Sequence, residues 1–178
     1  MIWIGTAGWA IPRAAAERFP EGGSHLERYA KIFNCAEINS SFRHAHRPAT
    51  YARWAAATPP GFRFSVKLPE EITHRRRLAG VVEPLARFLD EAGALGDRLG
   101  PLLVQLPGSL ALDARVARTF FAVLRRRFDG HVVCEPRHAS WFGATAEALL
   151  ARHRIGCVAA DPARVQKAAQ PGGWLGDA

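Results

Sequence analysis

Carboxylate and amide side chains occur inside short apolar stretches that otherwise suit buried strands. Glu37 and Asn39 stand two positions apart in CAEINSSF (35–42), and Glu135 ends HVVCE (131–135). Side chains two positions apart on a strand point to the same face, so Glu37 and Asn39 would lie side by side. Carboxylates perform general acid–base catalysis or bind divalent metals, which makes a chemical site one explanation for their presence.

Other polar residues share this placement at the end of an apolar run. Lys67 lies near the end of FRFSVKL (62–68) and Gln105 near the end of PLLVQL (101–106), while Asp161 follows RIGCVAA (154–160). In parallel strands the carboxyl ends meet at one edge, where barrel enzymes carry their active sites. We therefore expect these polar residues to form one site.

The resulting hypothesis is a site that binds a phosphate-containing or other anionic substrate. The catalytic candidates are Glu37, Lys67, Glu135, His74 and His138. The substrate-binding candidates are Asn39, Gln105, Arg137, Trp9, Trp141 and Asp161. Carboxylates would act as bases or metal ligands, cations would hold the anion, and histidines would transfer protons. The Trp rings would either stack on a base or sugar or cap the core against water.

The metal and the reaction stay open at this point. The sequence contains no HExxH and no CxxC, so a divalent metal would need ligands from several strand ends. A metal-dependent hydrolase of nucleic-acid phosphodiesters is one hypothesis, and a Schiff base on Lys67 is a weaker one. The alternatives are a non-catalytic nucleic-acid-binding module, an inactive truncated barrel, and an ion-pair network that only satisfies buried charges.

Apolar runs alternate with helical patterns along the whole chain. The predicted strands are MIWIG (1–5), 35–42, 62–68, 101–106, 131–135 and 154–160, and the predicted helices are 24–33, 48–57, 82–99, 113–128 and 145–153. Ser24 with Glu27 predicts a capping box, and Asp113 predicts an N-cap. Strands separated by helices favour βαβ units with a parallel sheet in an α/β fold.

A barrel explains why polar residues alternate with apolar ones on strands of such a sheet. In that arrangement Phe62, Phe64 and Val66 face the helices, while Arg63, Ser65 and Lys67 face the interior. A TIM-barrel-like fold needs eight strands and about 250 residues. The 178 residues supply about six strands, so we expect a single barrel-like domain over 1–178 that is incomplete at its C-terminus. Its open edges would allow self-association.

Five motifs together resemble the YecE-like family, a domain of unknown function. They are GTAGW, EINSSF, TPPGFRFSVKLP with ITH beyond it, LGPLLVQLP and EPRHASWF. The resemblance implies a TIM-barrel-like fold and implies no activity. Family members typically have an apolar residue where this chain has Pro136. They also continue beyond the Asp161 region with an Arg-Leu-His-Gly-like motif, whereas this chain ends in GGWLGDA, which favours truncation.

The composition indicates a basic globular protein. The formal net charge is +8, and the Arg-rich runs HRRR (74–77) and RRR (125–127) are either solvated surface or phosphate-binding patches. Nucleic acid or a phosphorylated small molecule is therefore a candidate partner. The separated Cys35, Cys134 and Cys157 predict buried free thiols. No apolar run approaches the roughly 20 residues of a membrane span, so we expect no membrane partner and a cytoplasmic location.

Overall fold

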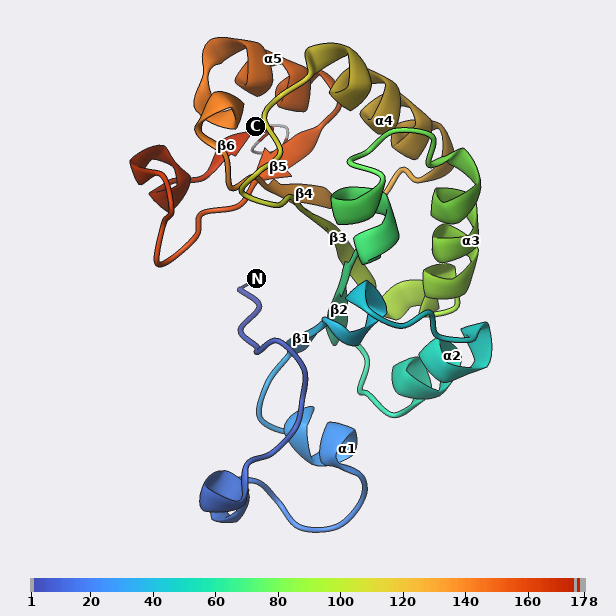
Figure 1. Ribbon diagram of the computed structural model, residues 1–178. Helices are drawn as coiled ribbons and strands as arrows, with labels where there is room; N and C mark the ends of the chain where they lie inside the picture. The colour runs from blue at the N-terminus through green and yellow to red at the C-terminus, as the bar shows by residue number, and fades with distance from the viewer. Residues whose placement is uncertain (1, 175, 177–178) are drawn as a thin grey trace. The chain divides into compact units, whose positions relative to one another are not determined.

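The computed structural model describes residues 2–174 and 176. In this part of the chain the strands are β1 (Cys35–Ile38), β2 (Arg63–Lys67), β3 (Leu99–Gln105), β4 (Val132–Glu135), β5 (Ile155–Cys157) and β6 (Gly172–Gly173). They follow one another in the sheet in chain order. The pairs β1–β2, β3–β4 and β4–β5 are parallel, and β5–β6 is antiparallel. The predicted α/β class with a mostly parallel sheet is confirmed (Figure 1).

The helices begin close to the positions that their capping residues predict. They are α1 (His25–Tyr29), α2 (Pro48–Ala56), α3 (Val82–Gly93), α4 (Ala114–Arg127) and α5 (Ala144–Arg152). Ser24 forms the predicted capping box with Glu27, and Asp113 accepts hydrogen bonds from the N–H groups of Arg115 and Val116. Two predicted helices end early, α1 at Tyr29 rather than 33 and α3 at Gly93 rather than 99.

The chain divides into two compact units. The first consists of Met1–Lys67 with Asp90–Gly100, and the second of Leu68–Leu89 with Pro101–Ala178. The core of the first unit contains the predicted apolar positions of β1 and β2, since Ala36, Ile38, Phe64 and Val66 are all buried. The alternate residues Glu37 and Ser65 are half-buried, as the strand period requires, so polar groups of both strands share a face.

The second unit is built on β3, β4 and β5. Buried and half-buried residues alternate along β4, whereas Leu102, Leu103 and Val104 of β3 are all buried. Helices α4 and α5 lie along these strands on one side (Figure 1). The helix α4 contributes Ala117, Phe120, Phe121 and Leu124, all at most 1% exposed, which are spaced three and four residues apart as on one helical face. Burial of this kind stabilises the fold by about 2 kcal/mol for each large side chain.

The strand predicted for MIWIG is wrong, because residues 2–5 form no regular ladder. The N–H of Ile4 donates to the side chain of Asn34 (2.7 Å), and the N–H of Thr6 donates to the hydroxyl of Tyr29 (2.8 Å). These side chains take the donors that a neighbouring strand would use, and a single parallel bridge joins Ala7 to Glu37. The sixth strand of the sheet is instead the short β6, which the sequence did not predict.

The described residues also bear on the membrane prediction. None of their helices combines the length and the apolar character that crossing a bilayer requires.

Candidate functional site

Two of the polar strand ends, those of β3 and β4 in the second unit, are in contact. Gln105 and Glu135 are the last residues of β3 and β4, and they are paired in the register of these parallel strands. The Gln105 amide Nε2 donates to Glu135 Oε2 at 2.8 Å. A side chain predicted to orient substrate therefore holds a predicted catalytic carboxylate.

Arg137 occupies the other oxygen of the same carboxylate. Its Nε and Nη2 atoms both lie 2.8 Å from Glu135 Oε1. The Glu135 side chain is 14% exposed and that of Arg137 is 34% exposed, so the ion pair is largely shielded from water. A shielded carboxylate needs such partners, and the pair in turn fixes the direction of the guanidinium.

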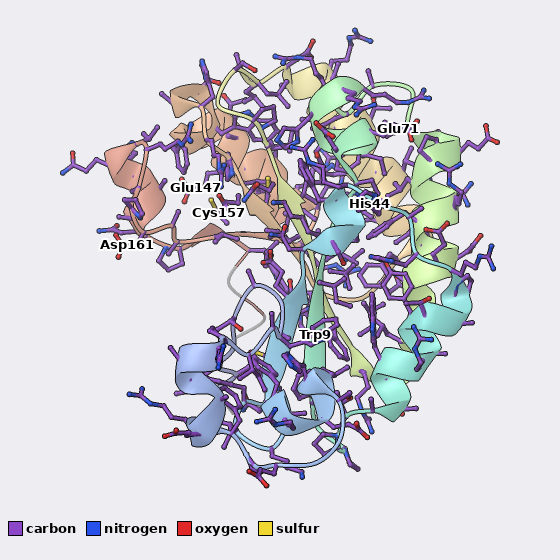
Figure 2. All side chains as sticks on the ribbon, turned by 60° about the horizontal axis from the view of Figure 1, so that its bottom comes forward. Trp9, His44, Glu71, Glu147, Cys157 and Asp161 are labelled. Carbon is purple, nitrogen blue, oxygen red and sulfur yellow. The ribbon has the colours of Figure 1, made fainter. Side chains whose placement is uncertain are left out.

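A pocket of about 420 Å³ lies beside this pair, beyond the ends of β4 and β5. Its charged lining residues are Glu135, Arg137, Asp161 and Arg164, and we call it the arginine pocket. Asp161 and Arg164 are exposed, and neither makes a hydrogen bond or ion pair with another described residue. Asp161 projects from the loop after β5 (Figure 2). The volume is within the range of small-ligand sites.

Arg164 is a pocket residue that sequence reasoning missed. It stands three positions after Asp161, much as Arg137 stands two positions after Glu135. Its position as a charged residue shortly after a strand end was therefore the sequence signal that could have identified Arg164.

Three other predicted residues of the second unit have structural partners. His138 is the N-cap of the short helix Ala139–Phe142 and accepts the N–H of Ser140 through Nδ1. Trp141 is 2% exposed, and its indole N–H donates to the carbonyl of Leu110, which favours the core-capping interpretation over stacking. His74 lies in Glu71–Arg75, with its Nδ1 2.8 Å from the hydroxyl of Thr73.

The first unit holds a larger pocket, of about 570 Å³, which we call the tryptophan pocket. Three predicted site residues line it: Trp9 (Figure 2), Glu37 and Asn39. The rest of its wall is mainly aromatic and apolar, and includes Phe19, Tyr29 and Phe33. Glu37 and Asn39, which the sequence predicted to share a face, both lie at the polar edge of this pocket.

Lys67 is not among the residues that line the tryptophan pocket. It is the last residue of β2, is 9% exposed, and places its ammonium 4.4 Å from the centre of the Phe42 ring. A cation at this distance from an aromatic face is stabilised by the ring. The Ser41 hydroxyl donates to the Lys67 carbonyl, which ties the strand end to the following turn.

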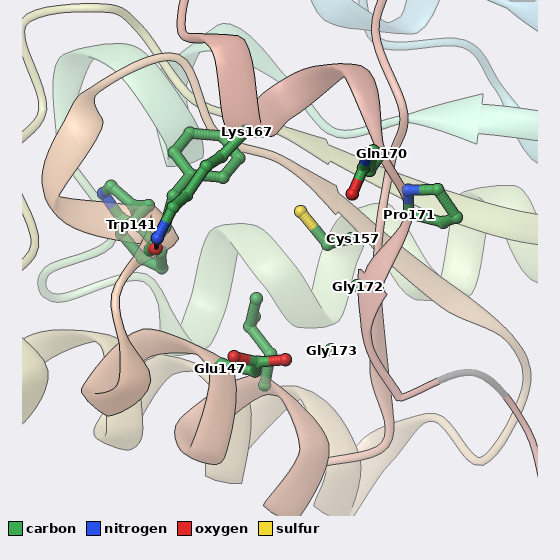
Figure 3. Close-up of a pocket in the computed structure, with 10 residues that line it drawn as sticks. Trp141, Glu147, Cys157, Lys167, Gln170, Pro171, Gly172 and Gly173 are labelled. Atoms are coloured by element: carbon green, nitrogen blue, oxygen red, sulfur yellow. Dashed lines mark hydrogen bonds between the residues drawn. The ribbon is translucent and has the colours of Figure 1, made fainter.

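A third pocket, of about 220 Å³, surrounds Cys157 in the second unit. Figure 3 shows its thiol pointing into a space bordered by Glu147, Lys167 and Gln170. Burial, followed by the charge of Glu147, raises the pKa of Cys157, so the reactive thiolate is disfavoured. All three cysteines are free, and Cys134 is fully buried as predicted, while Cys35 and Cys157 are half-buried.

The described residues offer no ready ligand set for the divalent metal considered above. Among them, no three His, Cys, Asp or Glu side chains are grouped so that they could hold a metal ion.

The basic runs are largely engaged within the protein. Arg76 pairs with Glu71 at 2.9 Å, and Arg77 donates to the hydroxyl and the carbonyl of Ser109. Arg125 donates to four backbone carbonyls, those of Phe128, Gly130, His153 and Arg154. These arginines serve the fold, whereas Arg126 and Arg127 are exposed.

Comparison with known proteins places the chain beside uncharacterised relatives. A family model described as "Protein of unknown function DUF72" matches residues 3–177. The UPF0759 protein YecE of Escherichia coli K12 is 33% identical over 109 residues, which cover 61% of this chain and 39% of YecE. The predicted resemblance to YecE-like proteins is thus confirmed.

Solved structures of DUF72 family proteins share the fold. One from Enterococcus faecalis V583 has a TM-score of 0.74 at 20% identity, over 89% of this chain and 60% of that one. One from Thermotoga maritima MSB8 has a TM-score of 0.72 at 24% identity, over 89% and 64%. The chain therefore spans less than two thirds of these relatives, and its α/β fold is shared with them.

Proposed function

Because this chain belongs to the DUF72 family of proteins of unknown function, we propose its function from its own geometry. The arginine pocket binds a phosphate-containing or other anionic ligand at the carboxyl ends of β4 and β5. One observation carries this proposal: Arg137 is held by Glu135 at the wall of a pocket that also contains Arg164, which has no partner among the residues that the structure describes.

The donors of the two arginines suit an oxyanion. A guanidinium has five N–H donors, of which Arg137 uses those on Nε and Nη2 for Glu135. The remaining N–H groups of Arg137 and those of Arg164 can donate hydrogen bonds to phosphate oxygens in the bidentate geometry that arginine favours. Since Glu135 already orients Arg137, ligand binding costs less side-chain entropy than at a free arginine.

Asp161 suits the role of general base in phosphodiester hydrolysis better than Glu135. Both Glu135 oxygens accept hydrogen bonds, whereas Asp161 has no partner in the described part of the chain. Asp161 would take a proton from water as the water oxygen bonds to phosphorus, and the leaving alkoxide would take a proton from solvent. The arginines would stabilise the charge that develops on the phosphate oxygens.

The test combines binding with turnover. Calorimetry with inorganic phosphate should show binding that weakens about tenfold in Arg164→Gln, because one of the two gripping cations is lost. Asp161→Asn should keep phosphate binding and lose hydrolysis of bis(4-nitrophenyl) phosphate. The matched control Arg126→Gln removes an exposed arginine that lies outside the pocket lining. Equal phosphate affinity in wild type, Arg164→Gln and Arg126→Gln would contradict the proposal.

A non-catalytic nucleic-acid-binding module is the second candidate, favoured by the net charge of +8. The internal contacts of Arg76, Arg77 and Arg125 weaken it, since these guanidinium groups already have partners. Binding to oligonucleotides through surface charge would fall steeply between 50 and 200 mM salt. In that case Arg126→Gln would weaken oligonucleotide binding, and Arg164→Gln would have no greater effect.

A further inference from the structure

We propose that the tryptophan pocket of the first unit is a separate binding site for a nucleobase, a planar ring that offers N–H donors. Its lining combines several aromatic rings with a short polar edge formed by Glu37, Asn39 and Ser40. Ligand pockets typically pair a large apolar wall with a few well-placed polar groups. The inference is independent of the anion site, because it concerns other residues.

The aromatic wall is fixed before any ligand arrives. Trp9 packs edge-to-face against Trp54 and Phe64, with ring centres 5.1 and 5.7 Å away. Tyr29 stacks on Phe33 at 4.8 Å between ring centres. The rings therefore present a rigid surface, which reduces the entropy lost on binding.

The hydroxyl of Tyr29 is already used within the protein. It accepts the N–H of Thr6 at 2.8 Å and donates to the carbonyl of Cys35 at 2.9 Å. Tyr29 is 2% exposed and stacked on Phe33, so it supports the wall of the pocket and offers no hydroxyl to a ligand. Specific polar contacts would come from the other edge.

That edge lies at the carboxyl end of β1. Glu37 is half-buried on the strand, and Asn39 is exposed directly after it. An ionised carboxylate only accepts hydrogen bonds, and an amide both accepts and donates. Ser40 continues the edge, with its hydroxyl held 2.8 Å from Nε2 of His46. A ligand with adjacent N–H groups in one plane matches this edge, as in the N1–H and 2-amino groups of guanine.

A nucleobase suits the pocket better than a sugar. Every base has two flat faces that stack on aromatic side chains, and its polar atoms lie only at its edge. A sugar carries hydroxyls around its whole ring, so an aromatic wall would leave several of them without partners. The volume of about 570 Å³ is ample for a purine.

The experiment titrates the protein with guanosine and follows tryptophan fluorescence, with glucose as the comparison ligand. Guanosine lacks a phosphate, so binding at the arginine pocket does not contribute. We expect guanosine to bind and glucose not to bind. Trp9→Leu should weaken guanosine binding about tenfold through lost stacking. Asn39→Ala should weaken it about fivefold, and because Asn39 is exposed this variant should fold normally.

Matched controls separate the pocket from general effects. Trp3→Leu removes a tryptophan that is 48% exposed and lies outside the pocket, and Gln166→Ala removes an exposed amide elsewhere. Both should bind guanosine like the wild type. No binding of guanosine at millimolar concentration overturns the proposal, and so does binding that Asn39→Ala and a folded Trp9→Leu leave unchanged. Preference for glucose over guanosine also overturns it.

Discussion

Arg137 is tied to Glu135 through two nitrogen atoms, Nε and Nη2, each 2.8 Å from the same carboxylate oxygen. The second oxygen of Glu135 accepts from the amide of Gln105 at 2.8 Å. A carboxylate with donors on both oxygens is suited to positioning an arginine. Glu135 would therefore act through Arg137, and the pocket-facing roles would fall to Arg137, Asp161 and Arg164.

The contact between Gln105 and Glu135 should contribute to stability. Gln105→Ala leaves Glu135 Oε2 without its donor at a side chain that is 14% exposed. We expect the free energy of unfolding to fall by about 1 kcal/mol, measured by urea denaturation. Gln166→Ala, which changes an exposed amide, should stay within about 0.5 kcal/mol of the wild type. Equal stability of the two variants would mean that the hydrogen bond is replaced by water.

Arg125 should be a stabilising residue despite its place in a basic run. Its guanidinium donates to four carbonyls around the end of α4 and the end of α5. Arg125→Met keeps the apolar stem and removes every donor, so we expect a loss of about 2 kcal/mol in unfolding free energy. The neighbouring Arg126→Met should change stability by less than about 0.5 kcal/mol. If both variants weaken nucleic-acid binding and neither affects stability, the phosphate-patch interpretation of the run would be the better one.

Two histidines should make the protein less stable in mild acid. Burial lowers the pKa of His46 below its ordinary value of 6.5, with His44 adding to the effect, and burial followed by nearby arginines lowers the pKa of His153. Below pH 6.5 these two histidines therefore bind more protons in the unfolded chain than in the folded chain. The stability that the two neutral histidines give the folded state is complete above pH 6.5. It is lost as the pH falls through their lowered pKa values in the folded state.

His153→Phe offers a direct check of this pH dependence. Nε2 of His153 is buried and has no hydrogen-bond partner among the described residues, and the ring lies 6.2 Å from that of Phe121. Phenylalanine should fit the site and carries no titrating group. Unfolding free energies between pH 7.5 and 5 should thus fall less in His153→Phe than in the wild type. Parallel curves for the two proteins would assign the acid sensitivity to other groups.

The exposed apolar residues before β1 predict self-association. Ile2, Trp3 and Ile4 are 81%, 48% and 64% exposed, in an extended segment that pairs only briefly with β1. Exposed apolar groups beside a sheet edge favour pairing with another chain. Sedimentation should show a concentration-dependent dimer, which Trp3→Glu shifts to monomer. A wild-type monomer at every concentration would exclude this association.

Much of the fold was predictable because local signals agreed with it. Alternating burial on β1 and β2 and the caps at Ser24 and Asp113 were all readable from residue types. The strand at MIWIG was wrong because distant side chains take backbone donors in and just after it: Asn34 accepts from Ile4, and Tyr29 accepts from Thr6. No local pattern reveals such tertiary competition.

The site was predictable only in part. The strand-end rule selected Glu135 and Asp161, which line the arginine pocket, and Gln105, which donates to Glu135. The same rule applied to the following loop would have selected Arg164. It could not tell that Glu135 is saturated by Arg137 and Gln105, since that depends on side-chain direction. Nor could it separate His138, which caps a short helix, from a histidine that transfers protons.

The affinity of Arg137→Lys for inorganic phosphate, compared with the wild type in an NMR titration, tests the central claim most directly. Lysine keeps the charge beside Glu135 but lacks the fork that holds two oxygens. If the arginine pocket binds the anion as proposed, the substitution weakens binding about tenfold, or ~1.4 kcal/mol, and resonances of residues lining the pocket shift on titration. Unchanged affinity, or shifts confined to residues outside the pocket, would contradict the account.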